Sequence, residues 1–167
     1  MQASIGIGIV GFGWMGRAHS RSYRSIPVYF PEAGLSPRLV GVADPDPEQV
    51  HLALSKFGFE SGTADYRELL ERDDIDVIDI TAPNGMHREL AEAAAAAGKH
   101  IFCEKPVGVE PSATTAMEAA ARRAGVITGC GYNYRWAPLV QYARSLIQAG
   151  RLGELTHYRG RFFTMYG

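Results

Sequence analysis

The chain has 167 residues, of which 46% are hydrophobic and 21% are charged, as in an ordinary globular domain. Seventeen lysines and arginines against eighteen acidic residues give a net charge of −1, which argues against a nucleic-acid partner. No apolar run approaches the roughly 18 residues of a membrane span, and the N-terminus lacks a signal-peptide pattern, so no membrane partner is expected. The two cysteines form no disulfide framework, which favours a cytoplasmic location.

Strands and helices are expected to alternate along the first 131 residues. Short apolar runs predict strands at 5–10, 38–43, 76–80, 100–103 and 126–130, with a short extended piece at 59–63. Helical patterns fall between them, at 14–25, 46–57, 66–72, 88–97 and 112–124. Because several strands are apolar throughout, we expect a doubly wound parallel sheet with helices on both faces. The segment 27–37 carries three prolines and is expected to be an inserted surface loop.

The chain changes character after residue 131. Apolar residues at helical spacing predict an amphipathic helix over 138–149, which begins with Pro138 and is followed by Gly150. Residues 155–165 are rich in aromatic and β-branched side chains and predict a strand that has no partner strand in the sequence. We therefore expect two domains, at 1–131 and 132–167. The second is a truncated α/β domain, so the chain is expected to be the N-terminal part of a longer protein.

A glycine-rich turn follows the first expected strand and opens the first helix. Its residues are Gly11, Phe12, Gly13, Trp14, Met15 and Gly16. In this context the first glycine permits the tight turn, the second lets the backbone approach a pyrophosphate, and the third lets helix and strand pack closely. The phosphates would lie at the helix N-terminus, where free N–H groups favour an anion. The turn therefore predicts a dinucleotide-binding Rossmann domain; the alternative is a turn whose glycines serve packing alone.

Asp44 ends the second expected strand. A carboxylate there can accept hydrogen bonds from the adenosine ribose and would repel a 2′-phosphate, so NAD is expected and NADP is disfavoured. Asp44 lies 28 residues after Gly16 instead of about 20, and the insertion at 27–37 accounts for the excess. The alternative is that Asp44 caps the following helix, a role that Asp46 could also fill.

Two later segments carry a family resemblance. A Pro-Asn-x-x-His pattern occupies 83–87, and an Ala-Gly-Lys-His pattern leads into Glu-Lys-Pro over 97–106. With the glycine turn, these segments resemble the glucose–fructose oxidoreductase/inositol dehydrogenase (Gfo/Idh/MocA) family over essentially the whole chain. The resemblance implies a Rossmann domain followed by an α/β domain with a large, mostly antiparallel sheet. It also implies a homo-oligomer that oxidises or reduces sugars, cyclitols or related polyols with NAD(P).

Lys105 is the expected catalytic residue, because it follows a strand at the edge where open α/β sheets bind ligands. Its ammonium would hold the reacting hydroxyl and stabilise the developing alkoxide, and Glu104 would orient it; the alternative is a solvated lysine. The resemblance places a further set along the cofactor, namely Thr81, Ala82, Pro83, Asn84, His87, Glu104, Lys105 and Asn133. Lys105, Asn133 and Arg135 are the expected substrate residues. Alternatively, Asn84 is a helix cap and His87 a packed core histidine.

The sequence thus predicts an NAD-dependent oxidoreductase that moves a hydride between nicotinamide and a sugar or polyol. This chain would be its cofactor half, inactive alone. The family's usual Asp-x-x-x-His pair is absent after Gly131, where His157 is the only histidine, so no proton-transfer residue is assigned. An NAD-dependent glycoside hydrolase of the same family and a non-enzymatic NAD-binding module remain alternatives.

The remaining candidate groups predict no further chemistry. No cluster of histidine, cysteine and aspartate has metal-ligand spacing, so no metal is expected. Cys103 and Cys130 each end a predicted strand and are expected to be sheet neighbours that act as small buried hydrophobes. A redox pair is the alternative.

Overall fold

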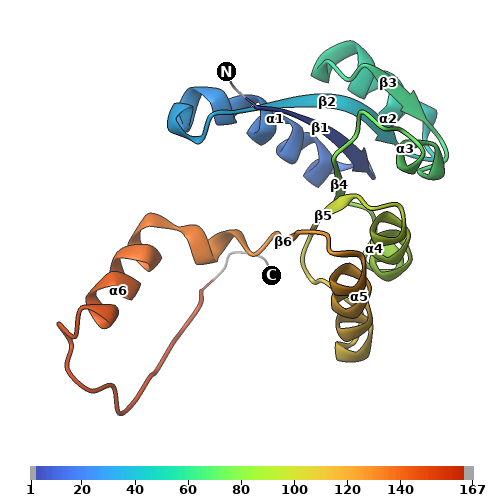
Figure 1. Cartoon of the computed structure of the whole chain (residues 1–167). Helices are drawn as coiled ribbons and strands as arrows, with labels where there is room; N and C mark the ends of the chain where they lie inside the picture. The colour runs from blue at the N-terminus through green and yellow to red at the C-terminus, as the bar shows by residue number, and fades with distance from the viewer. Residues whose placement is uncertain (1–2, 164–167) are drawn as a thin grey trace. The chain divides into compact units, whose positions relative to one another are not determined.

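A six-stranded parallel sheet dominates the computed structural model, which describes residues 3–163 (Figure 1). The strands lie in the order β3-β2-β1-β4-β5-β6, and every pair of neighbours is parallel. This order confirms the doubly wound α/β fold. The chain reverses direction across the sheet between β1 and β4, and ligands of such folds bind outside the carboxyl ends of the strands at that point.

The helices and strands lie close to the positions that the sequence predicts. The strands are β1 (Ala3–Val10), β2 (Leu35–Ala43), β3 (Ser61–Thr63), β4 (Val77–Ile80), β5 (His100–Cys103) and β6 (Thr128–Cys130). The helices between them are α1 (Trp14–Tyr29), α2 (Pro47–Leu52), α3 (Arg67–Leu70), α4 (His87–Ala96) and α5 (Pro111–Ala124). Short turns of helix occur at η1 (Pro31–Ala33), η2 (Ala53–Phe57, a π-helical turn that continues α2) and η3 (Asn84–Met86).

The chain separates into two compact units, residues 1–131 and 132–167. The first unit holds the sheet and helices α1 to α5. The second holds η4 (Asn133–Trp136) and α6 (Pro138–Gln148). That this second unit begins a further domain stays a prediction. Within residues 3–163, no helix has the length and apolar character to cross a membrane.

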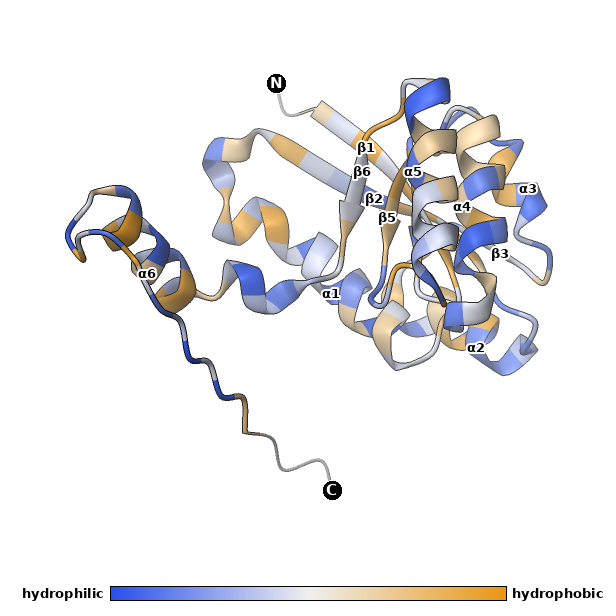
Figure 2. Cartoon of the chain, turned by 90° about the horizontal axis from the view of Figure 1, so that it is seen from below, coloured by the Kyte–Doolittle hydropathy of each residue, from blue (hydrophilic) through white to orange (hydrophobic). Residues whose placement is uncertain are grey.

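Apolar side chains cover the sheet of the first unit on both faces. On one face, Ile78 and Ile80 of β4 pack with Leu90 of α4 and Met117 of α5. On the other face, Ile9 of β1 packs in a cluster that contains the aromatic rings Phe12, Phe57 and Phe59. In Figure 2, α4 and α5 alternate between hydrophilic and hydrophobic colours, as amphipathic helices do. Each fully buried side chain of this kind contributes about 1.5–3 kcal/mol, which holds helices and sheet together.

The prediction of a surface loop at 27–37 was wrong. α1 continues through Pro27 and ends two residues later, and β2 already begins at Leu35. Proline in a helix removes one backbone hydrogen bond, which α1 tolerates because Pro27 lies in its last turn. Pro37 lies in β2 at a position where β3 has not yet begun, since the β2–β3 pairing starts at Gly41. The missing N–H of Pro37 therefore costs no ladder bond on that side.

The strand expected at 155–165 is not formed over 155–163, and residues 164–165 lie outside the described part. The described residues of this segment are irregular and exposed. Aromatic and β-branched residues favour a strand only where a partner strand supplies ladder hydrogen bonds. The helix expected at 138–149 is confirmed as α6, whose Leu139, Val140 and Ile147 side chains are exposed.

The glycines of the turn after β1 differ in what an added side chain would meet. Gly11 has a φ of +90°, and a Cβ there would lie 2.7 Å from the backbone of Ala82. Gly13 has a φ of −68° and open space around the same position. We expect Gly11→Ala to lower the free energy of unfolding by about 2 kcal/mol or more, and Gly13→Ala to change it by less than about 0.5 kcal/mol. Urea unfolding followed by circular dichroism measures this difference, and equal stability of the two variants would contradict it.

Candidate functional site

A cleft of about 630 Å³ opens at the carboxyl ends of β1, β2 and β4. Its volume is in the range of small-molecule sites, and it lies at the ligand edge where the strand order reverses. Residues from the strand ends and the turns after them line it: Val10, Gly11, Gly13, Trp14, Met15, Ala43, Asp44, Pro45, Ala64, Tyr66, Thr81, Ala82, Pro83 and Met86. The topology therefore brings together the turns after β1, β2, β3 and β4, which are far apart in the sequence.

Many of the predicted cofactor residues line this cleft: Gly11, Gly13, Trp14, Met15, Asp44, Thr81, Ala82 and Pro83. Sequence reasoning missed Ala64 and Tyr66, which follow β3 and belong to no motif, and Met86, which occupies a variable position of the Pro-Asn-x-x-His pattern after β4. Only their position after a strand of the parallel sheet could have indicated them.

Phe12 and Gly16 do not line the cleft, although both belong to the glycine turn. The Phe12 ring is fully buried and meets Phe57 and Phe59 edge-on, with ring centroids 5.1 and 5.4 Å apart. Gly16 is buried beneath the turn, where a Cβ would collide with the carbonyl oxygen of Gly11. Phe12 thus anchors the turn in the core, and Gly16 lets α1 begin directly against it.

The N-terminus of α1 faces the cleft without a side-chain cap. Gly13 is the N-cap, and the first turn of α1 contains no acidic residue. The first N–H groups of a helix have no intrahelical partner, and the helix dipole adds partial positive charge there. Because no carboxylate of this turn competes, the helix N-terminus fits the pyrophosphate of a dinucleotide.

Asp44 connects the glycine turn to the turn after β2. Its Oδ2 accepts the backbone N–H of Phe12 at 2.6 Å, and its Oδ1 accepts that of Asp46 at 2.9 Å. Asp46, not Asp44, caps α2, because Asp46 Oδ1 accepts the N–H of Glu48 at 2.9 Å. A carboxylate offers about four lone-pair positions, so Asp44 retains acceptors for ribose hydroxyls.

Asn84 and His87 hold the loop that follows β5. Asn84 Nδ2 donates to the carbonyl oxygen of Pro106 at 2.6 Å, so its side chain does not cap a helix. His87 is buried, with Nε2 2.9 Å from the Ala82 carbonyl oxygen and Nδ1 3.1 Å from that of Pro106. His87 is therefore a packed histidine, and neither side chain lines the cleft.

Lys105 follows β5, one strand along the same edge from the cleft residues that follow β4. Its backbone N–H donates to Glu104 Oε2 at 3.0 Å, and its bond to Pro106 is cis. Its side chain is exposed, and the ammonium has no hydrogen-bond or ion-pair partner among residues 3–163. The backbone of Lys105 is thus held on both sides, by Glu104 before it and by the contacts to Pro106 after it, while its side chain is free to meet a ligand.

A buried polar network beneath this loop was not predicted. His19 of α1 places Nδ1 2.9 Å from Asp79 Oδ2 and Nε2 3.2 Å from Glu104 Oε1. Asp79 of β4 is fully buried, and the Tyr23 hydroxyl donates to it. A charged residue inside the apolar run 76–80 was the available signal, because buried carboxylates are rare unless they are paired.

The pKa values of these groups are shifted by burial and by one another. Burial alone lowers the pKa of His19, but the hydrogen bond and charge of Asp79 and the nearby charge of Glu104 hold it above its ordinary value. Burial raises the pKa of the Asp79 carboxyl, against the opposing hydrogen bonds from His19 and Tyr23. Burial likewise raises the pKa of the Tyr23 phenol, with the charge of Asp79 adding to it. Both shifts favour keeping the proton that the His19–Asp79 pair shares, so the pair loses it at a higher pH than the isolated groups would.

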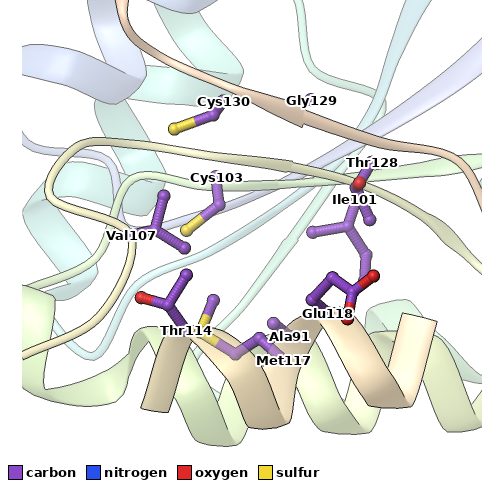
Figure 3. Close-up of a pocket in the computed structure, with 10 residues that line it drawn as sticks. All are labelled: Ala91, Ile101, Cys103, Val107, Thr114, Met117, Glu118, Thr128, Gly129 and Cys130. Atoms are coloured by element: carbon purple, nitrogen blue, oxygen red, sulfur yellow. The ribbon is translucent and has the colours of Figure 1, made fainter. Parts of the chain in front are cut away.

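A second cavity, of about 220 Å³, lies between α5 and the strands β5 and β6 (Figure 3). Cys103 and Cys130 line it and are register partners on the two strands, as expected. Burial raises the pKa of the Cys103 thiol to about 12. A thiol in that state is a poor nucleophile, which favours the packing role over the redox pair. Within the described part of the chain, no group of three or more histidine, cysteine or acidic side chains could hold a metal ion.

Asn133 and Arg135 belong to the second unit. They lie on η4, where both side chains are exposed. The carbonyl oxygen of Arg135 accepts a hydrogen bond from Gln141 Nε2 of α6, which ties η4 to the following helix.

Sequence comparison relates the chain to sugar and polyol dehydrogenases. Levoglucosan dehydrogenase of Pseudarthrobacter phenanthrenivorans is 38% identical over 159 residues, which are 95% of this chain and 41% of the relative. The NAD⁺-dependent scyllo-inositol 2-dehydrogenase of Bacillus subtilis is 29% identical over 161 residues, 96% of this chain and 45% of the relative. The chain spans less than half the length of these curated relatives.

Solved structures give the same relationship. Levoglucosan dehydrogenase in complex with NADH superposes with a TM-score of 0.87 at 38% identity, over 91% of this chain and 41% of that one. The apo scyllo-inositol dehydrogenase of Lactobacillus casei gives 0.81 at 28% identity, over 93% and 44% of the two chains.

The family profile of these enzymes matches residues 5–132 and is described as an oxidoreductase family with an NAD-binding Rossmann fold. The match spans most of the chain, confirms the resemblance drawn from the sequence motifs, and agrees with NAD as the expected cofactor. The chain belongs to the Gfo/Idh/MocA oxidoreductase family, and its residues 5–132 are the NAD-binding Rossmann fold of that family.

Proposed function

We propose that this chain binds NAD and forms the cofactor part of a dehydrogenase that acts on a sugar or polyol. One observation carries the proposal. The uncapped N-terminus of α1 and the carboxylate of Asp44 share one cleft, and Lys105 follows the next strand along the same sheet edge. These groups supply an anion site, a ribose acceptor and a cation for a reacting oxygen.

The described residues fit a dinucleotide. The N–H groups at the start of α1 would hold the pyrophosphate, and the open space at Gly13 lets the backbone approach it. Asp44 would accept hydrogen bonds from the adenosine ribose. The residues after β4, Thr81, Ala82 and Pro83, would lie along the cofactor, where the Thr81 hydroxyl already donates to the Gly11 carbonyl oxygen.

NAD, when bound, supplies the hydride acceptor of the reaction. The contribution of Lys105 is electrostatic: its ammonium would hold the substrate hydroxyl and stabilise the negative charge that grows on that oxygen. Its fixed backbone limits the positions that the ammonium can reach, which lowers the entropic cost of the reacting geometry. A proton acceptor is not assigned among these residues, because the Asp-x-x-x-His pair typical of the family is absent from the sequence after Gly131.

Residues 132–167 are proposed to begin a substrate domain, to which Asn133 and Arg135 would contribute amide and guanidinium donors for substrate hydroxyls. The matched relatives include dehydrogenases named for levoglucosan and inositol, which supports a polyhydroxylated substrate. We further propose a cytoplasmic homo-oligomer for the complete protein. Two cysteines that form no disulfide support the reducing compartment.

Lys105→Met tests the proposed catalytic cation in the complete protein. The substitution keeps most of the side-chain volume and removes the ammonium. We expect kcat with the best polyol substrate to fall about 10²–10³-fold, the loss typical of one oxyanion-stabilising donor. The affinity for NADH should change less than about tenfold, because the glycine turn and Asp44 hold the cofactor.

Lys56→Met is the matched control, since Lys56 is exposed on η2 and lines no part of the cleft. Steady-state kinetics and NADH fluorescence titration measure the two variants. A Lys105→Met enzyme with the kcat of the Lys56→Met enzyme would remove Lys105 from the reaction.

Gly13→Ala tests the anion site independently of catalysis. A methyl group at this position meets no protein atom within 4 Å, so the fold should tolerate it. It would project toward the ligand at the start of α1, and we expect NADH to bind at least about tenfold more weakly at unchanged stability. NADH titration measures the affinity, and urea unfolding of the same sample measures the stability. Unchanged NADH affinity would exclude close approach of the cofactor to this turn.

Asp44→Asn tests the choice between NAD and NADP. The carboxylate would lie next to a 2′-phosphate, and this repulsion costs about 1–3 kcal/mol, so NAD should bind about ten- to a hundredfold more tightly than NADP. Asparagine keeps the size of the side chain and an oxygen for the N–H of Phe12, gives up the acceptor for the N–H of Asp46, and removes the charge, so the preference should fall about tenfold. Asp46→Asn is the control, because Asp46 does not line the cleft and asparagine also caps helices. Calorimetric titration of NAD and NADP at one ionic strength measures this preference. If Asp44→Asn leaves the preference for NAD unaltered, Asp44 does not select between the two cofactors.

A further inference from the structure

His19 is the one described side chain that hydrogen-bonds both to a buried acid of the sheet and to the loop carrying Lys105. It lies on α1, between Asp79 of β4 and Glu104 after β5. Its side chain is only 14% exposed, and the ring of Phe102 packs edge-on against it at 5.5 Å. Water therefore has little access to replace either contact.

Both contacts require a hydrogen-bond donor from the imidazole ring, so they compete for its protons. Carboxylate oxygens accept hydrogen bonds, so each ring nitrogen of His19 must carry or share a proton to satisfy its partner. A neutral imidazole has one N–H and leaves a lone pair facing one of the two carboxylates. The arrangement is complete only while the His19–Asp79 pair retains the second proton, whichever of the two groups carries it.

The Glu104 carboxylate connects His19 to the backbone of Lys105. Oε1 of Glu104 meets His19, and Oε2 accepts the backbone N–H of Lys105 at 3.0 Å. Gly131 packs against the same carboxylate, since a Cβ at Gly131 would collide with Oε1. The carboxyl group is thus confined between His19, the Lys105 backbone and the end of β6.

We propose that His19 is the positioning residue for Lys105: its Nε2–H holds Glu104, and Glu104 in turn holds the Lys105 backbone at the ligand edge. This inference rests on the proposed function only for the use of Lys105 in the reaction; the contact chain itself is independent of any ligand. His19 touches neither cofactor nor substrate in this scheme and acts through Glu104.

The chain of contacts predicts a dependence on pH. The ionisable groups that act on the His19 ring are Asp79 from β4 and Glu104 after β5. Tyr23 of α1 acts on Asp79, and Cys103 of β5 lies near both acids. As the pH rises through the raised pKa of His19, the single remaining N–H should go to Asp79, which is the more deeply buried acid and has the larger need of a donor. Glu104 Oε1 then loses the hydrogen bond from His19. The Glu104 carboxylate is therefore fixed against the Lys105 backbone at low pH and released at high pH.

Two variants separate the proposal from a merely structural role of His19. The amide nitrogen of glutamine reaches the position of Nε2, and that of asparagine reaches the position of Nδ1. His19→Gln therefore keeps a donor for Glu104, whereas His19→Asn keeps one for Asp79. If His19 served only to satisfy the buried Asp79, asparagine would be the better replacement.

The measurement is amide hydrogen exchange and ¹H–¹⁵N NMR of the chain without any ligand. In the wild type, the protection factor of the Lys105 amide should fall about tenfold as the ring nitrogens of His19 titrate, the effect of losing one hydrogen bond to a charged acceptor. His19→Gln should keep the protection and abolish its pH dependence. His19→Asn should lose the protection at every pH.

Gly131→Ala gives the same test without altering His19. The added methyl group would collide with Oε1 and displace the Glu104 carboxylate from both His19 and the Lys105 backbone, so the Lys105 amide should lose protection while the His19 ring still titrates. Equal protection of the Lys105 amide in His19→Gln and His19→Asn, or full protection in Gly131→Ala, would overturn the proposal. Should His19→Asn fail to fold, the pH dependence of Lys105 protection in the wild type and its absence in His19→Gln decide; a Lys105 amide that keeps its protection across the His19 titration would then overturn the proposal.

Kinetics in the complete protein then test the proposed function separately. His19→Asn should lower kcat more than His19→Gln does, and neither should change the affinity for NADH by more than about threefold, since His19 lines no part of the cleft. If Lys105→Met leaves kcat intact while the Lys105 amide still follows His19, the proposed catalytic role fails and the positioning contact stands.

Discussion

The hydrogen bond from the Phe12 N–H to the Asp44 carboxylate joins the turn after β1 to the turn after β2, and the ligand edge depends on it. A glycine turn that leaves the first N–H groups of a helix free for a ligand gives up a side-chain cap worth about 1 kcal/mol. This turn also contains a positive φ at Gly11. Contacts from outside must therefore hold it in place. Asp44 supplies one such contact, and the Thr81 hydroxyl supplies another at the Gly11 carbonyl oxygen.

The same physical solution recurs after β5. Glu104 accepts the N–H of Lys105, and Asn84 and His87 contact the carbonyl oxygen of Pro106. Main-chain anchors fix the position of the Lys105 backbone, while the ammonium has no partner among the described residues, 3–163. A cation already paired with a carboxylate would have to break that pair before it could stabilise charge on a ligand. Holding the backbone instead of the side chain avoids this cost.

The helices, the strands of the sheet and the glycine turn could be predicted because the residue patterns that encode them lie within short stretches of sequence. Asp44 was found for the same reason, since it ends an apolar run. The contact between His19 and Glu104 spans 85 positions and exists only because α1 and β5 meet at one sheet edge, so no local pattern encodes it. The prediction of a surface loop at 27–37 was wrong for a related reason. Whether a strand tolerates Pro37 depends on the absence of a neighbouring strand at that point, which is a property of the sheet.

The burial of Asp79 is hard to explain by its contribution to the stability of the fold. Its neighbours Ile78 and Ile80 are aliphatic, as a strand buried on both faces requires. A carboxylate at this position loses its hydration, and a well-packed apolar residue in place of a buried ion pair is often as stable or more so. Within residues 3–163, the hydrogen bonds of the Asp79 side chain go to His19 and Tyr23. The buried charge therefore fixes the orientation of the His19 ring, and the second nitrogen of that ring points to the loop that carries Lys105.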